Sequence, residues 1–174
     1  MGKKIIRVIA VVLIPVVCLY LLTLLLTPKY VNDIPEGSMI AEYYKSEKNN
    51  DVLILGDCEV YENISTVTMW ENYGISSYIR GSAEQLIWQS YYLLEDTLKY
   101  EKPQVVIVNV LAMTESDAKN EAYNRMTLDG MKLSKYKIAS IRESMTEEEN
   151  MASYIFPLLR YHSRWSELSS EDFR

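Results

Sequence analysis

The first apolar pattern in the chain is one long uninterrupted run. Residues 8–26 carry no charge and follow a basic start that contains Lys3, Lys4 and Arg7. At about 1.5 Å of rise per residue, a helix of this length spans close to the roughly 30 Å hydrocarbon core of a bilayer. The run is longer than the apolar core of a cleavable signal peptide, which has about 7–15 residues. We therefore expect a retained transmembrane anchor.

The charges around this run predict its orientation. All three basic residues precede it, so the positive-inside rule places the N-terminus in the cytoplasm and the main domain outside the cell. Residues 28–50 contain two prolines and end in a polar sequence, which favours a stalk. We accordingly divide the chain into a basic end with the anchor over 1–27, a stalk over 28–50 and a folded domain over 51–174.

Within the expected domain, short apolar runs alternate with helical patterns. Strand-type runs cover 51–55, 75–79 and 104–113, and the first and third are nearly continuous, which is typical of strands covered on both faces. A short helical segment closed by Gly74 follows the first run, and a helix opened by a capping box over 82–85 follows the second. Strands joined by helices in this order predict an α/β fold with a doubly wound, flavodoxin-like parallel sheet.

After Met113 the strand pattern is not repeated. Helical patterns cover 114–126 and 137–143, and a second capping box over 146–149 predicts a helix that ends by Pro157. Three strands make a small parallel sheet, so we expect an incomplete version of this fold.

Charge and composition exclude several kinds of site. After the three N-terminal cations, 15 basic residues stand against 24 acidic ones, a formal net charge of −9 that disfavours nucleic acid as a partner. The chain has one histidine and two cysteines, Cys18 in the anchor and Cys58 in the domain. These residues, and the absence of phosphate-loop glycine patterns, predict neither a metal site nor a bound cofactor.

The ends of the expected strands suggest where a site lies. In open α/β sheets, ligands bind outside the carboxyl ends of the strands. The first strand ends at Gly56-Asp57-Cys58, the second at Arg80-Gly81-Ser82 and the third near Asn109. We expect these residues to line one crevice with the Cys58 thiol at its mouth. The neighbouring carboxylates of Asp57 and Glu59 should raise the pKa of that thiol.

Some side chains have ordinary structural interpretations. Asp57 is expected to cap the segment after it, because N-capping by aspartate is common. An arginine at a strand end, such as Arg80, is usually a solvated charge. Trp70 and Trp88 lie at helical spacing with other apolar residues, so we expect them in the core or at its edge.

The strand-end residues also carry a family resemblance. The segments LILGDCEVYENI, YGISSY and QVVIVNV resemble membrane-anchored SGNH (GDSL-like) hydrolases of Gram-positive bacteria, over roughly residues 34–168. The resemblance implies that Cys58 occupies the nucleophile position and that Asp57 belongs to the nucleophile turn. It also implies oxyanion donors at the Cys58 amide, Gly81 and Asn109. Some relatives act on acyl esters of cell-envelope polysaccharides, so the implied protein is an esterase or acyltransferase with an acylated glycan as substrate.

Three differences from the family leave the activity open. Cysteine replaces the family's serine, and the Gly-x-Asn-Asp and Asp-x-x-His blocks have no match. The sole histidine, His162, stands beside Tyr161 and near Trp165, where it is more often a packed or surface residue than a general base. Two alternatives therefore accompany the enzyme hypothesis. One is a catalytically inactive binding or assembly module of the cell envelope, and the other is the first part of a longer enzyme whose histidine lies beyond Arg174.

Overall fold

The computed structural model describes two compact units, each with its own packing. Described are residues 2–28, 38–114 and 120–173. The anchor unit comprises Met1–Tyr30 with Ala152–Arg174, and the sheet unit comprises Val31–Met151. The expected domain over 51–174 is therefore divided, because its last part groups with the N-terminal helix.

The anchor unit is built on α1 (Gly2–Leu26), whose segment Arg7–Leu26 has a mean hydropathy of 3.0. This helix is long and apolar enough to span a membrane. Arg164 donates a hydrogen bond of 2.8 Å to the Leu26 carbonyl and also pairs with Asp172. It thus provides a partner for one of the carbonyls left open at the end of α1. The other elements of the unit are α8 (Met151–Ile155), α9 (Leu158–Tyr161), η3 (His162–Ser166) and η4 (Ser170–Phe173).

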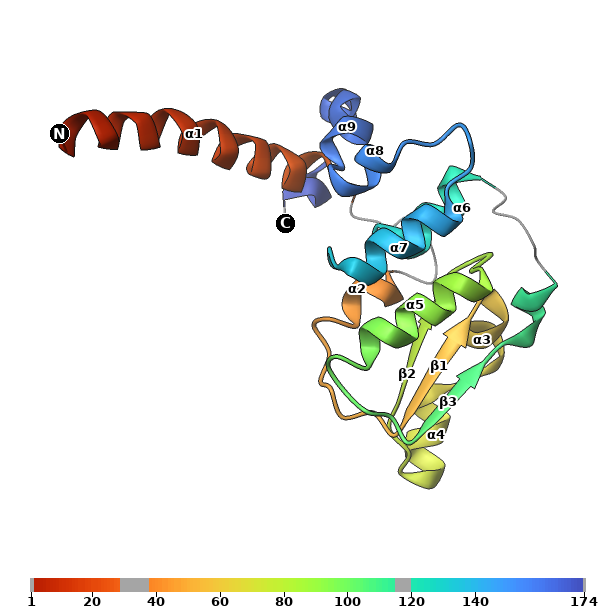
Figure 1. The fold of residues 1–174 in the computed structure, drawn as a ribbon. Coiled ribbons are helices and arrows are strands. Elements are labelled where there is room, and N and C mark those ends of the chain that lie inside the picture. The colour runs from red at the N-terminus through yellow and green to blue at the C-terminus, as the bar shows by residue number, and fades with distance from the viewer. Residues whose placement is uncertain (1, 29–37, 115–119, 174) are drawn as a thin grey trace. The chain divides into compact units, whose positions relative to one another are not determined.

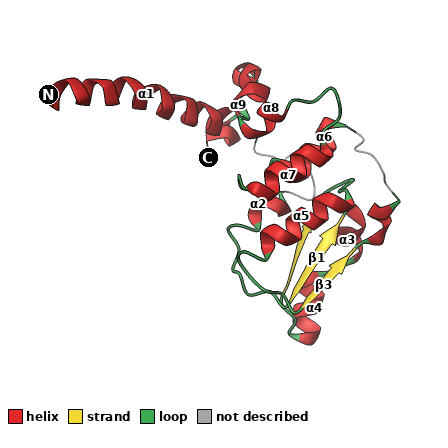
Figure 2. Ribbon diagram, in the orientation of Figure 1, coloured by secondary structure: helices red, strands yellow, loops and turns green. Residues whose placement is uncertain are grey.

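The sheet unit contains a parallel sheet of three strands (Figures 1 and 2), which confirms the expected α/β class. The strands are β1 (Val52–Gly56), β2 (Ser77–Gly81) and β3 (Val105–Val108), in the order β2-β1-β3. In this register Leu55 of β1 lies between Arg80 of β2 and Val108 of β3. The central strand is fully buried along its length, as its continuous apolar sequence predicts.

Helices pack on both faces of the sheet. Val60 of α3 and Met69 of α4 contact the face formed by Val52 and Ile54. The opposite face, which carries Arg80, contacts α5 (Figure 1). Gly74 ends α4 in the left-handed conformation, as expected. The elements that follow β1 and β2 are α3 (Cys58–Asn63), α4 (Thr66–Tyr73) and α5 (Ile87–Thr97).

The folded unit begins earlier than the sequence pattern suggested. Residues 29–37 of the expected stalk lie outside the described residues, but α2 (Met39–Glu42) belongs to the sheet unit. Ile40 and Tyr43 are buried there, and the Tyr78 hydroxyl donates a hydrogen bond of 3.0 Å to the Met39 carbonyl. The stalk interpretation therefore does not hold for this segment, because its apolar residues cover the β2 side of the sheet.

Both expected capping boxes are displaced from the helices that they were to open. The helix after β2 starts only at Ile87, although the Ser82 hydroxyl donates to the Gln85 side chain at 3.2 Å; the same hydroxyl also lies 2.5 Å from that of Thr127, far along the chain. Thr146 and Glu149 do make the expected side-chain bond, at 2.9 Å, but α8 begins only at Met151.

The remaining helices of the sheet unit follow the third strand. The helix expected over 114–126 is described only from Glu121, since 115–119 lie outside the described residues. These elements are η2 (Val110–Met113), α6 (Glu121–Leu128) and α7 (Lys135–Ser144), the last close to the expected 137–143.

Two apolar elements are more exposed than their sequences predict. Every residue of β3 is exposed, by 37–51%, although its pattern is that of a strand covered on both faces. Within the described residues β3 lies at the edge of the sheet, with β1 on one side only. Trp70 is also exposed rather than in the core, because α4 faces the sheet with Met69 instead. Trp88 is partly buried at the core edge, where its indole N–H donates to Ser144.

Candidate functional site

The turn after β1 is held by one carboxylate. Asp57 precedes α3, and its Oδ1 accepts hydrogen bonds from the Glu59 amide at 3.0 Å and from the Asn109 side-chain nitrogen at 2.7 Å. The first bond is the expected N-cap. The second joins the carboxyl ends of β1 and β3, so that Asn109 points at the turn that carries Cys58.

Gly56 and Gly81 allow these strand ends to approach one another. A Cβ added to Gly56 would lie 2.6 Å from the Asn109 Cβ and 2.8 Å from Val60 Cγ1, closer than real carbon atoms come. Gly81 is paired with Gly56 in the register, and its own Cβ would lie 3.0 Å from the Gly56 carbonyl oxygen. Any larger residue at position 56 would therefore separate Asn109 from the turn.

Four of the five predicted site residues thus come from three strand ends at one edge of the sheet: Asp57, Cys58, Gly81 and Asn109. Asn109 is fixed at both ends of its amide, since its oxygen also accepts the Leu111 amide at 2.8 Å. One of its two side-chain hydrogens is used by Asp57, so the other is the one that can serve a ligand.

The fifth residue, His162, belongs to the anchor unit. It is exposed, and its Nδ1 lies 3.1 Å from the Leu159 carbonyl oxygen. Because the chain has no other histidine, the sheet unit contains no imidazole that could act as a base.

The Cys58 thiol is half-buried at the first residue of α3. Burial raises its pKa, and the negative charges of Asp57 and Glu62 raise it further. The thiol form therefore dominates at neutral pH, and nucleophilic attack requires a base that removes the proton at the moment of reaction.

An open hollow of about 400 Å³ lies beside this turn, between α3 and β3. Its apolar lining is Val60, Ile64, Ile107 and Leu111, while Glu59, Asn63 and Asn109 supply polar groups. A lining of this kind suits an apolar chain that ends in a polar group near Asn109.

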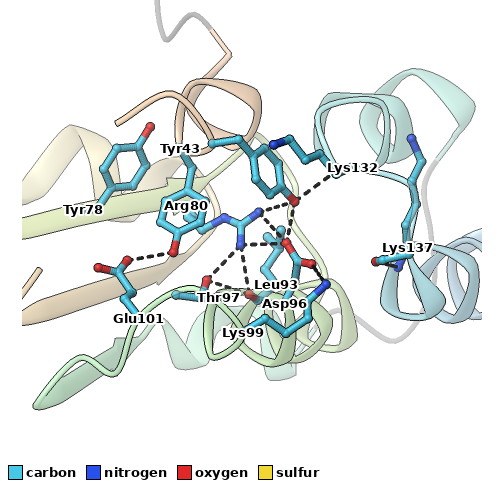
Figure 3. Close-up of polar contacts among 12 residues, drawn as sticks. Tyr43, Tyr78, Arg80, Leu93, Asp96, Thr97, Lys99, Glu101, Lys132 and Lys137 are labelled. Atoms are coloured by element: carbon cyan, nitrogen blue, oxygen red, sulfur yellow. Dashed lines mark hydrogen bonds and ion pairs between the residues drawn. The ribbon is translucent and has the colours of Figure 1, made fainter. Parts of the chain in front are cut away.

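Sequence reasoning missed a buried polar cluster on the opposite face of the sheet (Figure 3). Arg80 is wholly buried rather than solvated, and its Nη1 lies 2.8 Å from Thr97 Oγ1 and 3.4 Å from Asp96 Oδ2. Its guanidinium also stacks 4.3 Å from the ring centre of Tyr43. Arginine can be buried in this way because its planar group finds hydrogen bonds and an aromatic face together.

Two tyrosines connect this cluster to the segment after α2. The Tyr43 hydroxyl donates to Glu101 at 2.8 Å, and the Tyr44 hydroxyl donates to Asp96 at 2.5 Å. Burial, with the Asp96 hydrogen bond added and the Arg80 charge opposing, raises the pKa of Tyr44 to about 12. The only feature of the sequence that hinted at this cluster was the adjacent Tyr43-Tyr44 pair. A pair of tyrosines does not show which distant residues it will contact.

Within the described segments, no group of three or more His, Cys, Asp or Glu side chains is placed to hold a metal ion. The candidate site thus consists of a thiol, a side-chain amide and two glycines at the carboxyl ends of the parallel strands.

In comparisons with known proteins, the chain matches no family model, no curated protein and no solved structure.

Proposed function

We propose that the protein is a membrane-anchored, outward-facing SGNH-like esterase or acyltransferase, with Cys58 as its nucleophile. In this proposal the sheet belongs to a doubly wound SGNH-type fold, and the substrate is an acyl ester of an envelope glycan. The supporting observation is the convergence of three strand ends around the turn, with the Asn109 side chain 2.7 Å from Asp57. Parallel α/β sheets bind ligands at this edge.

The chemistry follows from the groups at the turn. The Cys58 sulfur attacks the acyl carbonyl, its proton passes to a base, and the alcohol leaves with a proton to give a thioester. Backbone N–H groups of Cys58 and Gly81 and the Asn109 amide stabilise the oxyanion. Water then releases the acid, or a second hydroxyl accepts the acyl group. Burial and the nearby negative charges raise the pKa of the Cys58 thiol, so removal of its proton is part of the attack.

A second candidate is an envelope binding or assembly module without catalysis. It is favoured by the negative charges of Asp57 and Glu62, which oppose thiolate formation at Cys58. In this role the turn is structural, and the exposed apolar surface of the sheet unit binds another molecule.

The experiment uses full-length protein in detergent micelles with a Cys18→Ala background, so that Cys58 is the one thiol. The protein is incubated with p-nitrophenyl acetate, and intact mass and p-nitrophenol release are followed. An acetyl group that forms on Cys58 and is absent in Cys58→Ala supports the enzyme. If Cys58 is acylated no faster than in the urea-unfolded protein, the enzyme proposal fails and the binding module remains.

A further inference from the structure

The free edge of β3 exposes backbone as well as side chains. The amides of Val105 and Asn109 point toward β1, where they donate to the carbonyls of Asp51 and Leu55 at 3.1 and 2.9 Å. Because successive amides of a strand alternate in direction, those of Val106 and Val108 point away from β1. Within the described residues no strand lies on that side.

Edge strands of folded proteins usually carry features that prevent further pairing. These include charged residues, prolines, bulges and a covering helix or loop. The four residues of β3 are all Val or Ile, and each is exposed by 37–51%. Beyond β3, Val110, Leu111 and Met113 of η2 are exposed as well. The sequence of β3 is thus that of a central strand, whereas its position is that of an edge strand.

The other edge of the same sheet is partly covered. Tyr78 of β2 bonds to Met39 at the start of α2, and Ile40 and Tyr43 are buried in this region. Part of the β2 edge is therefore covered by α2, whereas every residue of β3 is exposed.

Charge indicates what kind of strand would fit. The apolar hollow between α3 and β3 has Glu59 at its side, and Asp57 and Glu62 lie close enough to act on Cys58. No lysine or arginine pairs with Glu59 or Glu62 within the described part of the chain. A second copy of this chain, with a net charge of −6, would bring further negative charge to this edge.

We propose that the β3 edge binds a strand of a partner polypeptide that is apolar in its middle and carries lysine or arginine at its ends. The strand pairs with the outward amides of Val106 and Val108, covers the side chains of β3 and places a cation beside Glu59. This is recognition by strand addition, in which main-chain bonds give affinity and side chains give specificity. The proposal rests on β3 and does not require Cys58 to be catalytic.

The test uses the full-length protein in detergent micelles and a labelled synthetic peptide, KTVIVTK, followed by fluorescence anisotropy. Two peptide controls separate the contributions: ETVIVTE reverses the charge, and KTPIPTK removes backbone donors. Amide hydrogen exchange at Val106 and Val108 is measured with and without the peptide. We expect saturable binding of KTVIVTK, slower exchange at these two amides, and binding weakened about tenfold or more in each control peptide.

A protein variant tests the same edge. Val106→Pro removes one outward donor without removing a bond to β1, so the sheet should persist and the peptide should bind at least about tenfold more weakly. Val106→Thr keeps the donor and the side-chain shape, and it should bind the peptide like the parent. The circular dichroism spectrum of each variant checks folding.

Three outcomes would overturn the proposal. One is equal binding of all three peptides, which would indicate a nonspecific apolar contact. Another is a dimer of the parent protein that Val106→Pro dissociates, which would make a second copy the occupant. The last is protection of Val106 and Val108 in the peptide-free protein without peptide binding, which would mean that the chain itself covers the edge.

Discussion

The two neighbours of Leu55 show that burial in this sheet does not follow polarity. On one side lies Arg80, a cation with no exposed surface, and on the other lies Val108, an apolar residue that is 37% exposed. The difference is one of partners. Arg80 has Asp96, Thr97 and the ring of Tyr43 around it, whereas β3 has β1 on one side only within the described residues. A charge can be buried where most of its hydrogen bonds are supplied, as at Arg80, whose Nε alone has no partner among the described residues. An apolar strand needs a covering element instead.

The largest loss of stability should come from removing Arg80, at the centre of the buried polar cluster beside β2. Arg80→Met leaves Asp96 buried with one fewer cation, and loss of one member of a buried pair costs about 3–5 kcal/mol. The measurement is urea unfolding of the full chain in detergent micelles. The matched control is Lys45→Met, which removes the exposed ion pair with Glu42 and should cost about 0–1 kcal/mol. Equal costs for the two variants would contradict the assignment of Arg80 as the centre of the buried cluster.

The next prediction compares the stability cost of truncating a side chain in the central strand, β1, with the cost at the paired position in the exposed strand, β3. Ile54 and Ile107 are partners in the register and lie on the same face, but Ile54 is wholly buried and Ile107 is 37% exposed. Ile54→Ala should cost about 2–5 kcal/mol in the same urea assay, and Ile107→Ala about 1 kcal/mol or less. A large cost for Ile107→Ala would mean that the β3 side is already covered in the folded protein.

Local signals explain why part of the fold could be predicted. The continuous apolar run of β1, the glycine that ends α4 and the order of strands and helices are all encoded within a few residues of each element. The turn at Asp57 was predictable for the same reason, since its capping bond joins residues two positions apart.

The rest depends on contacts between distant segments. Arg80 bonds to Tyr44, 36 residues earlier, and Ser82 lies beside Thr127, 45 residues later. The bond between Asp57 and Asn109 spans 52 residues; the order of the strands predicted that their ends meet, but not which side chains bond there. An apolar run predicts that a strand should be covered but cannot say what covers it, which is why the exposure of β3 was not foreseen.

The third prediction concerns Gly56, at the end of the central strand β1, which pairs with both β2 and β3. Gly56→Ala places a methyl group 2.6 Å from the Asn109 Cβ, at a backbone φ of +156° that L-residues rarely adopt. Overpacking of this kind costs about 1–3 kcal/mol, and the strained φ adds to it, so we expect a loss of about 2–3 kcal/mol. Gly74→Ala is the control, because its φ is +66° but no atom lies within 4 Å, and it should cost about 1 kcal/mol. Amide exchange of Asn109 should accelerate only in Gly56→Ala.

The smallest predicted effect is a dependence of the unfolding free energy on pH, which should come from tyrosines on the β2 side of the sheet and not from β3. The pKa values of Tyr44 and Tyr78 are raised to about 12 by burial, against an ordinary value near 10. Since the folded state holds these protons more tightly, their contribution is fully present below about pH 10 and is lost as the pH rises through 12. In the urea assay over this range, Tyr44→Phe should reduce the loss by about 1 kcal/mol, a figure discounted for the partial exposure of the ring. Tyr73→Phe, which removes an exposed hydroxyl, controls for the loss of a tyrosine.

The residues of β3 do not titrate, so the stability lost at alkaline pH should be the same in the parent and in Ile107→Ala. A smaller loss in Ile107→Ala would show that the two sides of the sheet unfold as coupled parts, and the contrast between Arg80 and Val108 would then describe packing but not stability.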